Sequence, residues 1–136
     1  MTFEQIYKND IFANEAGITI EHLDEQQAVM SVKVEPRHLN GGGVAHGGLI
    51  YTLADIAMAA IANYVNMGSL SIQSDIRFLS AGRVGDTLTA RATFVFGRKS
   101  LSNCRAEITN QEGELIALAD GMCYIKRSFS AEASKG

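Results

Sequence analysis

A stretch running from about Gly48 to Val65 constrains the fold of this chain more than any other feature. It has the length and residue types of a helix, and it is apolar nearly all round, with Leu49, Ile50, Leu53, Ala54, Ile56, Ala57, Met58, Ala59, Ala60, Ile61 and Ala62. A helix that is apolar on every side is buried on every side. Its many alanines allow other elements to approach closely, so we predict one long central helix with a sheet packed around it.

Most of the remaining sequence is typical of strands joined by short turns. Residues 28–35 alternate apolar and polar side chains, which predicts a strand with one buried face, and Pro36 ends it. Turn signals that contain glycine separate the later strands. The predicted elements are a short amphipathic helix at 3–12, strands at 17–23, 28–35, 69–79, 86–97, 101–110 and 114–126, and a flexible polar tail at 128–136.

These elements predict an α+β fold, in which an antiparallel sheet of about six strands wraps round one long central helix. We expect the strands after the helix to form an antiparallel meander. The 136 residues suit a single domain, 1–136, that begins with an N-terminal helical lead at 1–16. A wrapped sheet covers only part of the helix, so a second chain is expected to bury the rest, as a homodimer at least.

Charge and composition argue against several function classes. The 12 basic and 15 acidic residues give a net charge of -3, which disfavours nucleic acid as the main partner. No secretory signal is visible, and the apolar stretch 49–62 is interrupted by Asp55 and too short to span a bilayer, so no membrane role is expected. Cys104 and Cys123 form no CxxC pair, and we predict reduced core thiols in a cytoplasmic protein.

Asp55 is the first residue that points to chemistry. It lies within the apolar helix, too far past its start to cap the N-terminus. Burying an ionised carboxylate is costly unless it is paired, and desolvation raises its pKa, which suits a general base working near neutrality. The alternative is a structural aspartate that accepts hydrogen bonds from loop amides or from a hydroxyl across an interface.

The segment His46-Gly47-Gly48 at the start of the helix is the second such feature. The first N–H groups of a helix lack internal partners, and the helix dipole adds partial positive charge, so they can bind an oxyanion. The alternative is a tight turn without a ligand, with His46 as a neutral imidazole bonded to the loop. Asn40, in the glycine loop, either orients water or a carbonyl group or stabilises its own turn.

Other common sites are missing from the sequence. Three histidines, without an HExxH pattern or a Cys–His cluster, give no reason to expect a metal, and no cofactor is expected. No GxSxG or Walker pattern frames a nucleophile or a phosphate loop. Several basic residues are candidates for the phosphates of a nucleotide-like carrier or form an ordinary solvated face, namely Arg77, Arg83, Arg98, Lys99, Lys126 and Arg127.

Taken together, the pattern Asn40-x2-Gly43-x2-His46-Gly47-Gly48-x6-Asp55 resembles the signature of hotdog-fold acyl-CoA thioesterases, particularly the phenylacetate-degradation type. The resemblance runs from about residue 17 to 126 and includes Phe78-x4-Arg83-Val84-Gly85-Asp86. It implies a hotdog fold and hydrolysis of an aryl-acyl or medium-chain acyl-CoA to the free acid and coenzyme A.

The resemblance also implies roles for individual residues. Asp55 matches the catalytic carboxylate, as general base or nucleophile, and Gly47 matches the glycine whose N–H polarises the thioester carbonyl. Asn40 and His46 match residues that position water or substrate. Gly48 is expected to bind substrate as well.

Ser71 falls near a family hydroxyl position that supports the carboxylate. In such enzymes the site lies between protomers, with the loop of one facing the carboxylate of the other, and dimers often pair into homotetramers. Ser80-Ala81 stands where relatives often have proline. Gly41 and Gly42 are smaller than usual, which leaves the size of the acyl pocket open.

Two other functions remain possible on the sequence. An acyl-thioester dehydratase or hydratase would use His46 and Asp55 as a converging pair. A non-catalytic acyl-CoA-binding module would share the fold without the activity. The sequence also leaves open the acyl group, the choice between coenzyme A and acyl carrier protein, and the choice between a general-base and a covalent mechanism.

Overall fold

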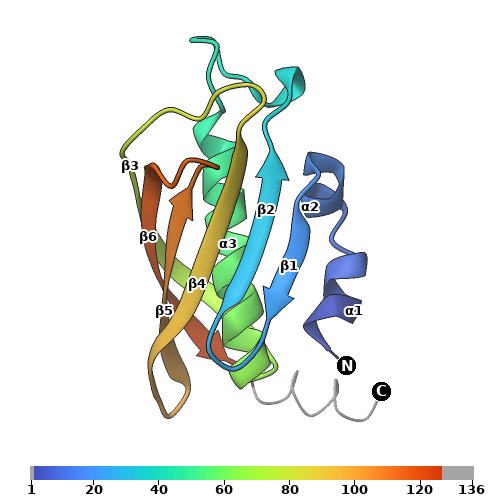
Figure 1. Ribbon diagram of the computed structural model, residues 1–136. Coiled ribbons are helices and arrows are strands. Elements are labelled where there is room, and N and C mark those ends of the chain that lie inside the picture. Colours follow the sequence, from blue (N-terminus) through green and yellow to red (C-terminus); the bar gives the residue numbers. More distant parts are fainter. Residues whose placement is uncertain (1, 127–136) are drawn as a thin grey trace.

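Two short helices precede the sheet in the computed structural model, which describes residues 2–126 (Figure 1). Helix α1 spans Phe3–Lys8 and α2 spans Ile11–Ala16. The prediction of one helix at 3–12 is wrong, because the chain leaves the helical conformation at Asn9. Asp10 then caps a new helix by accepting the Ala13 N–H at 3.0 Å. The predicted tail at 128–136 lies outside the described residues.

Six strands form one antiparallel sheet, which confirms the predicted α+β class. They are β1 (Thr19–Leu23), β2 (Ala28–Lys33), β3 (Ser69–Phe78), β4 (Thr87–Arg98), β5 (Leu101–Thr109) and β6 (Leu115–Ile125). Their order in the sheet is β1-β2-β4-β5-β6-β3. A short 3-10 helix, η1 (Pro36–His38), follows β2, so Pro36 ends that strand as predicted.

The predicted meander holds for β4, β5 and β6 but is wrong for β3. Strand β2 is paired with β4 from Ala28↔Ala92 to Lys33↔Thr87, and β5 occupies the other side of β4. No side of β4 is left for β3, which pairs with β6 at the far edge. One side of β3 is therefore unpaired within the described chain.

Strand β2 also departs from the prediction of a single buried face. Val29 and Ser31, expected to point toward solvent, are 8% exposed, as deeply buried as much of the core. The neighbouring strand explains the burial of Ser31, whose hydroxyl donates to the Glu21 carboxylate of β1 at 2.6 Å.

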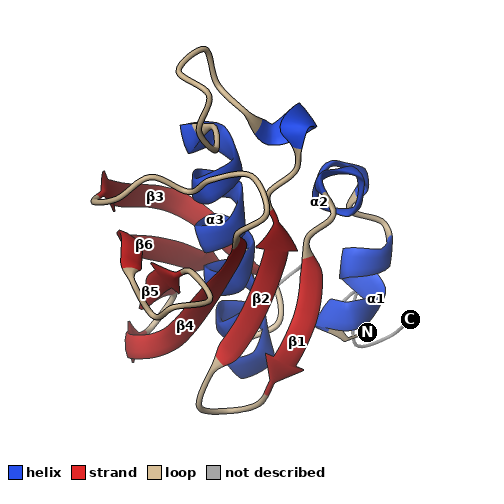
Figure 2. Ribbon diagram, turned by 45° about the horizontal axis from the view of Figure 1, so that its top comes forward, coloured by secondary structure: helices blue, strands red, loops and turns tan. Residues whose placement is uncertain are grey.

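Helix α3 (Gly47–Val65) lies along the concave side of the sheet, and the strands curl around it (Figures 1 and 2). Small residues on the inner face let the helix approach. Ala92, Ala106 and Ala119 are direct cross-strand neighbours on three adjacent strands. Gly121, also on β6, faces Met58 of α3, and a Cβ atom at Gly121 would lie 3.4 Å from the Met58 side chain. The predicted central helix is confirmed, one residue earlier than expected.

The whole of α3 is longer than the apolar stretch 49–62, and by length and composition alone it is long and apolar enough to cross a membrane. More than half of the apolar window is nevertheless buried inside the protein. The predicted core thiols, Cys104 and Cys123, are free and buried. Tyr51 near the start of α3 and Tyr64 near its end are exposed, on different sides of the helix.

Candidate active site

His46 occupies the N-cap of α3. Its backbone is extended, and its Nδ1 accepts the Gly48 N–H at 2.8 Å. In the neutral ring Nε2 therefore carries the proton and can still donate. The loop-bonded imidazole weighed as an alternative is thus present, and the Gly48 N–H is already used inside the protein. Within one chain, Gly48 cannot supply a second donor to an oxyanion without breaking its cap.

The Gly47 N–H, in contrast, has no acceptor among residues 2–126. It stands at the first position of a 19-residue helix, where the dipole contributes partial positive charge. A side chain at this position would meet the ring of Phe78 at 3.4 Å. Glycine therefore leaves the amide open to an approaching ligand, and this N–H can stabilise a developing oxyanion.

Asn40 shapes the loop that leads to α3. Its side-chain carbonyl accepts the Gly42 N–H at 2.9 Å and the Val44 N–H at 3.3 Å, so it stabilises its own turn. Its amide NH2 group has no acceptor in the described part of the chain. If Asn40 contacts water or substrate, it does so through this NH2 group. That role of Asn40 stays a prediction.

Asp55 lies eight positions beyond Gly47 and accepts no hydrogen bond from any described residue. Burial raises the pKa of this half-buried carboxyl group, and the nearby Asp10 carboxylate at the start of α2 raises it further. Both effects favour the protonated form and make the carboxylate a better proton acceptor. The structural alternative requires hydrogen-bond partners for Asp55, and residues 2–126 provide none.

Ser71 lies beside Cys123, whose thiol is influenced by the charge of Asp55. Ser71 is the direct cross-strand neighbour of Cys123, on the helix-facing side of β3. Burial raises the pKa of the Cys123 thiol, and the Asp55 carboxylate close by adds to the effect. No hydrogen bond joins Ser71 to Asp55 within the described residues, so the supporting role of Ser71 stays a prediction.

A pocket of about 510 Å³ opens beside the start of α3, between α2, η1 and the helix. Two predicted site residues, His46 and Gly48, line it together with Phe12, Tyr51 and Thr52. The sequence analysis missed the contribution of Phe12 and Tyr51. Neither residue belongs to a spacing pattern, because the pocket arises only when α2 packs against α3.

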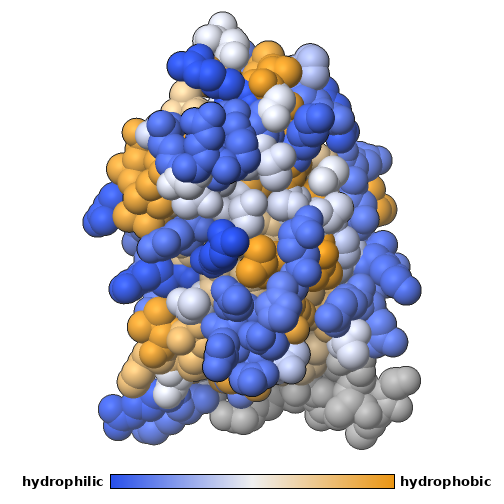
Figure 3. Space-filling view, in the orientation of Figure 1, coloured by the Kyte–Doolittle hydropathy of each residue, from blue (hydrophilic) through white to orange (hydrophobic). Residues whose placement is uncertain are grey.

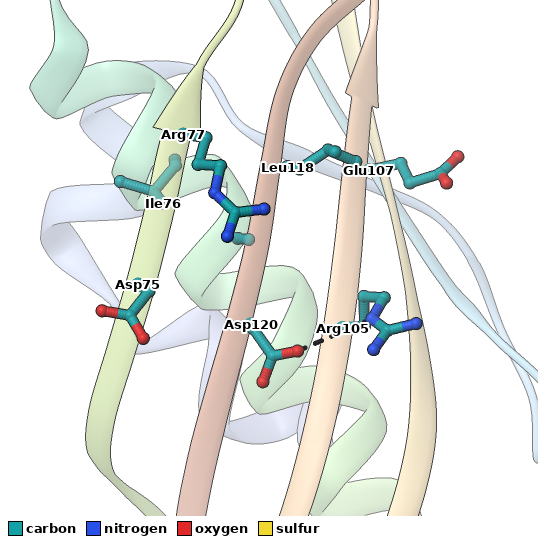
Figure 4. Close-up of a pocket in the computed structure, with 8 residues that line it drawn as sticks. Asp75, Ile76, Arg77, Arg105, Glu107, Leu118 and Asp120 are labelled. Atoms are coloured by element: carbon teal, nitrogen blue, oxygen red, sulfur yellow. Dashed lines mark ion pairs between the residues drawn. The ribbon is translucent and has the colours of Figure 1, made fainter.

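A larger hollow of about 730 Å³ lies on the outer face of the sheet (Figure 4). Charged side chains from β3, β5 and β6 line it, and Arg105 Nε lies 3.5 Å from the Asp120 carboxylate. Arg77, one candidate for binding phosphates, points into this hollow. None of the predicted catalytic residues lines this hollow, whereas His46 lines the pocket at the start of α3; Asp55 and Gly47 line neither.

The second family motif forms a turn that braces the glycine loop. The Asp86 carboxylate accepts the Arg83 N–H at 2.9 Å and holds the turn closed. Immediately before this turn, the Gly82 carbonyl accepts the Ala45 N–H at 2.7 Å. Arg83 therefore stabilises this turn through its backbone N–H.

The capping role of His46 can be separated from a role toward substrate. Replacing an N-cap by alanine costs about 0.5–2 kcal/mol, whereas asparagine is a good cap. We therefore expect His46→Ala to lower the free energy of unfolding in urea by that amount, and His46→Asn to retain most of it. Equal destabilisation by both substitutions would contradict the capping role. Turnover lost by His46→Asn at near wild-type stability would indicate a further role of the imidazole.

Comparison with known proteins identifies the family. Residues 42–117 match the model of the thioesterase superfamily. The chain is 37% identical over 119 residues to the acyl-coenzyme A thioesterase PaaI of Escherichia coli, covering 88% of this chain and 85% of that protein. The structure of the E. coli PaaI protein has a TM-score of 0.87 at 35% identity, covering 91% of this chain and 90% of that chain.

A hypothetical thioesterase of Streptococcus pneumoniae, solved with coenzyme A, has a TM-score of 0.82 at 28% identity and covers 89% of this chain and 96% of that chain. The same protein was also solved as variants in which one threonine or one aspartate is replaced by alanine. The family match spans more than half of this chain, and its fold is that of the solved relatives. The chain therefore belongs to the thioesterase superfamily, as a thioester hydrolase with the hotdog fold.

Proposed function

We propose that the protein hydrolyses acyl-coenzyme A, with an aryl-acyl or medium-chain acyl group, to the free acid and coenzyme A. The observation that carries the proposal is that α3 holds both a half-buried carboxylate, Asp55, and an N–H, that of Gly47, which have no hydrogen-bond partner among residues 2–126. The names of relatives support the substrate class, because PaaI is an acyl-coenzyme A thioesterase and the S. pneumoniae protein was solved with coenzyme A.

In the proposed reaction the thioester oxygen accepts a hydrogen bond from the Gly47 N–H, which polarises the carbonyl carbon. Asp55 takes a proton from water as the water oxygen attacks that carbon. The carbon–sulfur bond then breaks, and the departing thiolate of coenzyme A takes up a proton. In the covalent alternative, an Asp55 oxygen attacks first and forms an anhydride that water hydrolyses. The raised proton affinity of Asp55 supports the general-base route.

We further propose that each site is shared between two protomers. Gly47 and Asp55 of one chain are separated by about 12 Å along the helix axis, at 1.5 Å per residue. A carbonyl bound at Gly47 therefore lies too far along the helix for attack directed by Asp55 of the same chain. The unpaired edge of β3, with Ile72 58% exposed, supplies a surface for a two-fold dimer.

A relative supports the choice of Asp55 and Ser71. In the S. pneumoniae protein, the aspartate and the threonine that were replaced by alanine stand 16 positions apart, which is also the separation of Asp55 and Ser71. Serine and threonine both carry a hydroxyl that can donate to a carboxylate. We propose that the Ser71 hydroxyl orients Asp55 in the assembled enzyme.

Two such dimers are proposed to pair through the outer face of the sheet. Leu101, Tyr124 and Leu70 form one cross-strand row there, each 44–46% exposed. Figure 3 shows apolar atoms gathered over the lower end of β4 and β5, next to charged residues. We expect light scattering to give the mass of four chains. Tyr124→Lys should lower the measured mass to that of two chains and retain turnover. An unchanged mass would mean that the two dimers pair through another surface.

The function is tested by release of free thiol from a panel of aromatic and aliphatic acyl-CoAs. Steady release, with one acid formed for each thiol, is the expected result. Loss of the ultraviolet absorbance of an enoyl-CoA with the thioester intact would instead identify a hydratase. A stable acyl-CoA complex without turnover would identify a binding module. The free buried thiols of Cys104 and Cys123 support a reducing compartment, and we propose a cytoplasmic location.

A further inference from the structure

We propose that Phe12 of α2 forms a wall of the acyl pocket and sets the preference of the enzyme for large apolar acyl groups over acetyl. This inference rests on the proposed function, because it assigns the acyl end of the substrate to the pocket between α2 and α3.

The pocket lies on the face of α3 that leads to the proposed catalytic carboxylate. Gly48, Tyr51 and Thr52 line it, and Asp55 follows at the next helical spacing on the same face. Helix α2 lies opposite this face at the start of α3, where its residues Phe12 and Ala16 complete the lining. The pocket therefore opens along the first turns of α3, next to Gly47 and one helical turn before Asp55, neither of which is among its lining residues.

The free lining of the pocket is mostly apolar. Its volume of about 510 Å³ falls within the range of ordinary small-molecule sites. The polar groups at its wall already have partners. The Thr52 hydroxyl donates to the Gly48 carbonyl at 2.7 Å, the Tyr51 hydroxyl is bonded to the Ser74 hydroxyl, and the Arg37 guanidinium pairs with a glutamate at 2.7 Å. An apolar acyl group fits this lining, in which the Nε2–H of His46 is the exception and can still donate.

Phe12 and Ile11 make a matched pair for testing the wall. They are neighbours on α2, and each is 72% exposed. Phe12 lines the pocket, whereas Ile11 does not. An acyl group in the pocket would remove the Phe12 ring from water, and this gain is lost with alanine. Loss of a pocket contact of this kind changes discrimination between substrates by about 10- to 200-fold.

The experiment measures kcat/KM for phenylacetyl-CoA and for acetyl-CoA in wild type, Phe12→Ala and Ile11→Ala. We expect Phe12→Ala to lower the ratio of the two values by about 10- to 200-fold, through phenylacetyl-CoA, while Ile11→Ala leaves the ratio unchanged. Phe12→Leu, which keeps an apolar side chain, should fall between Phe12→Ala and wild type. A ratio that Phe12→Ala leaves unchanged, or that Ile11→Ala lowers equally, overturns the inference.

A binding measurement keeps this inference separate from the proposed function. A thioether analogue of phenylacetyl-CoA, which has no carbonyl to hydrolyse, is titrated against the same three proteins, with coenzyme A as reference. If Phe12→Ala weakens binding of the analogue but not of coenzyme A, the pocket assignment is supported even if wild type releases no thiol. Thiol release by wild type together with equal analogue binding by all three proteins retains the proposed function and rejects the role of Phe12.

Discussion

Asp55→Asn is expected to lower kcat by about 10²–10⁴-fold, the usual contribution of a positioned general base, and by more if Asp55 is the nucleophile. Asparagine has nearly the same shape as aspartate and leaves no cavity, so the loss reports the missing carboxylate. Thiol release from phenylacetyl-CoA is the measurement, and Asp75→Asn on the outer face of the sheet is the control. Wild-type-like turnover by Asp55→Asn would refute the role of Asp55.

The same substitution is expected to leave the protein at least as stable at neutral pH. Burial raises the folded-state pKa of Asp55 above its ordinary value of 3.8, so the folded state binds this proton more tightly than the unfolded state. The ionised carboxylate therefore costs stability as pH rises through the folded pKa. Asp55→Asn removes that cost at pH 7. Its free energy of unfolding in urea should exceed that of wild type at pH 7, and this difference should shrink as pH falls toward 3.8. A difference that grows on acidification would contradict a raised pKa of Asp55.

Gly47→Pro carries the second large expected effect, because it deletes the N–H that has no acceptor within residues 2–126. Loss of one oxyanion donor costs about 10²–10³-fold in kcat. Proline is favoured at the first position of a helix, and it requires an extended residue before it. His46, at φ −60° and ψ 138°, already has that conformation, so α3 should form normally.

Gly47→Ala is the matched control for this substitution. Its Cβ would meet the Phe78 ring at 3.4 Å, a contact that a small shift relieves, and its N–H is kept. We expect much of the turnover to survive in Gly47→Ala and circular dichroism to show native helix in both variants. Equal losses in the two variants would mean that bulk at this position, rather than the missing donor, limits the reaction.

The elements of the fold and the wrapping of a sheet round α3 were largely predictable from sequence periodicity, whereas the order of the strands in the sheet was not. The apolar helix and the alternating strands are local patterns, and their bounds agree with the structure within a few residues. Strand β3 lies beside β6 because β2, a distant segment of the chain, pairs with the edge of β4 that β3 would otherwise use. The division of the N-terminal helix at Asn9 follows from capping by Asp10, which the apolar pattern obscured.

The candidate site residues were chosen from their spacing, and the structure adds the hydrogen bonds that each of them makes. The sequence places Gly47 and Gly48 together as possible donors, and the structure separates them, because His46 already accepts the Gly48 N–H. The carbonyl of Asn40 is likewise used by its own loop. Phe12 has no signal in the sequence, since its place at the pocket depends on packing between helices.

A mixture of the two inactive variants tests the central claim most directly, that Asp55 of one protomer works on a thioester held by Gly47 of another. A heterodimer of Asp55→Asn and Gly47→Pro chains keeps one site with both groups intact, while the other site loses both. Chains carrying different affinity tags are unfolded and refolded together, and purified heterodimers are assayed for thiol release from phenylacetyl-CoA. Half of the wild-type activity per dimer is the predicted result. Purified heterodimers as inactive as their parents would contradict the shared site.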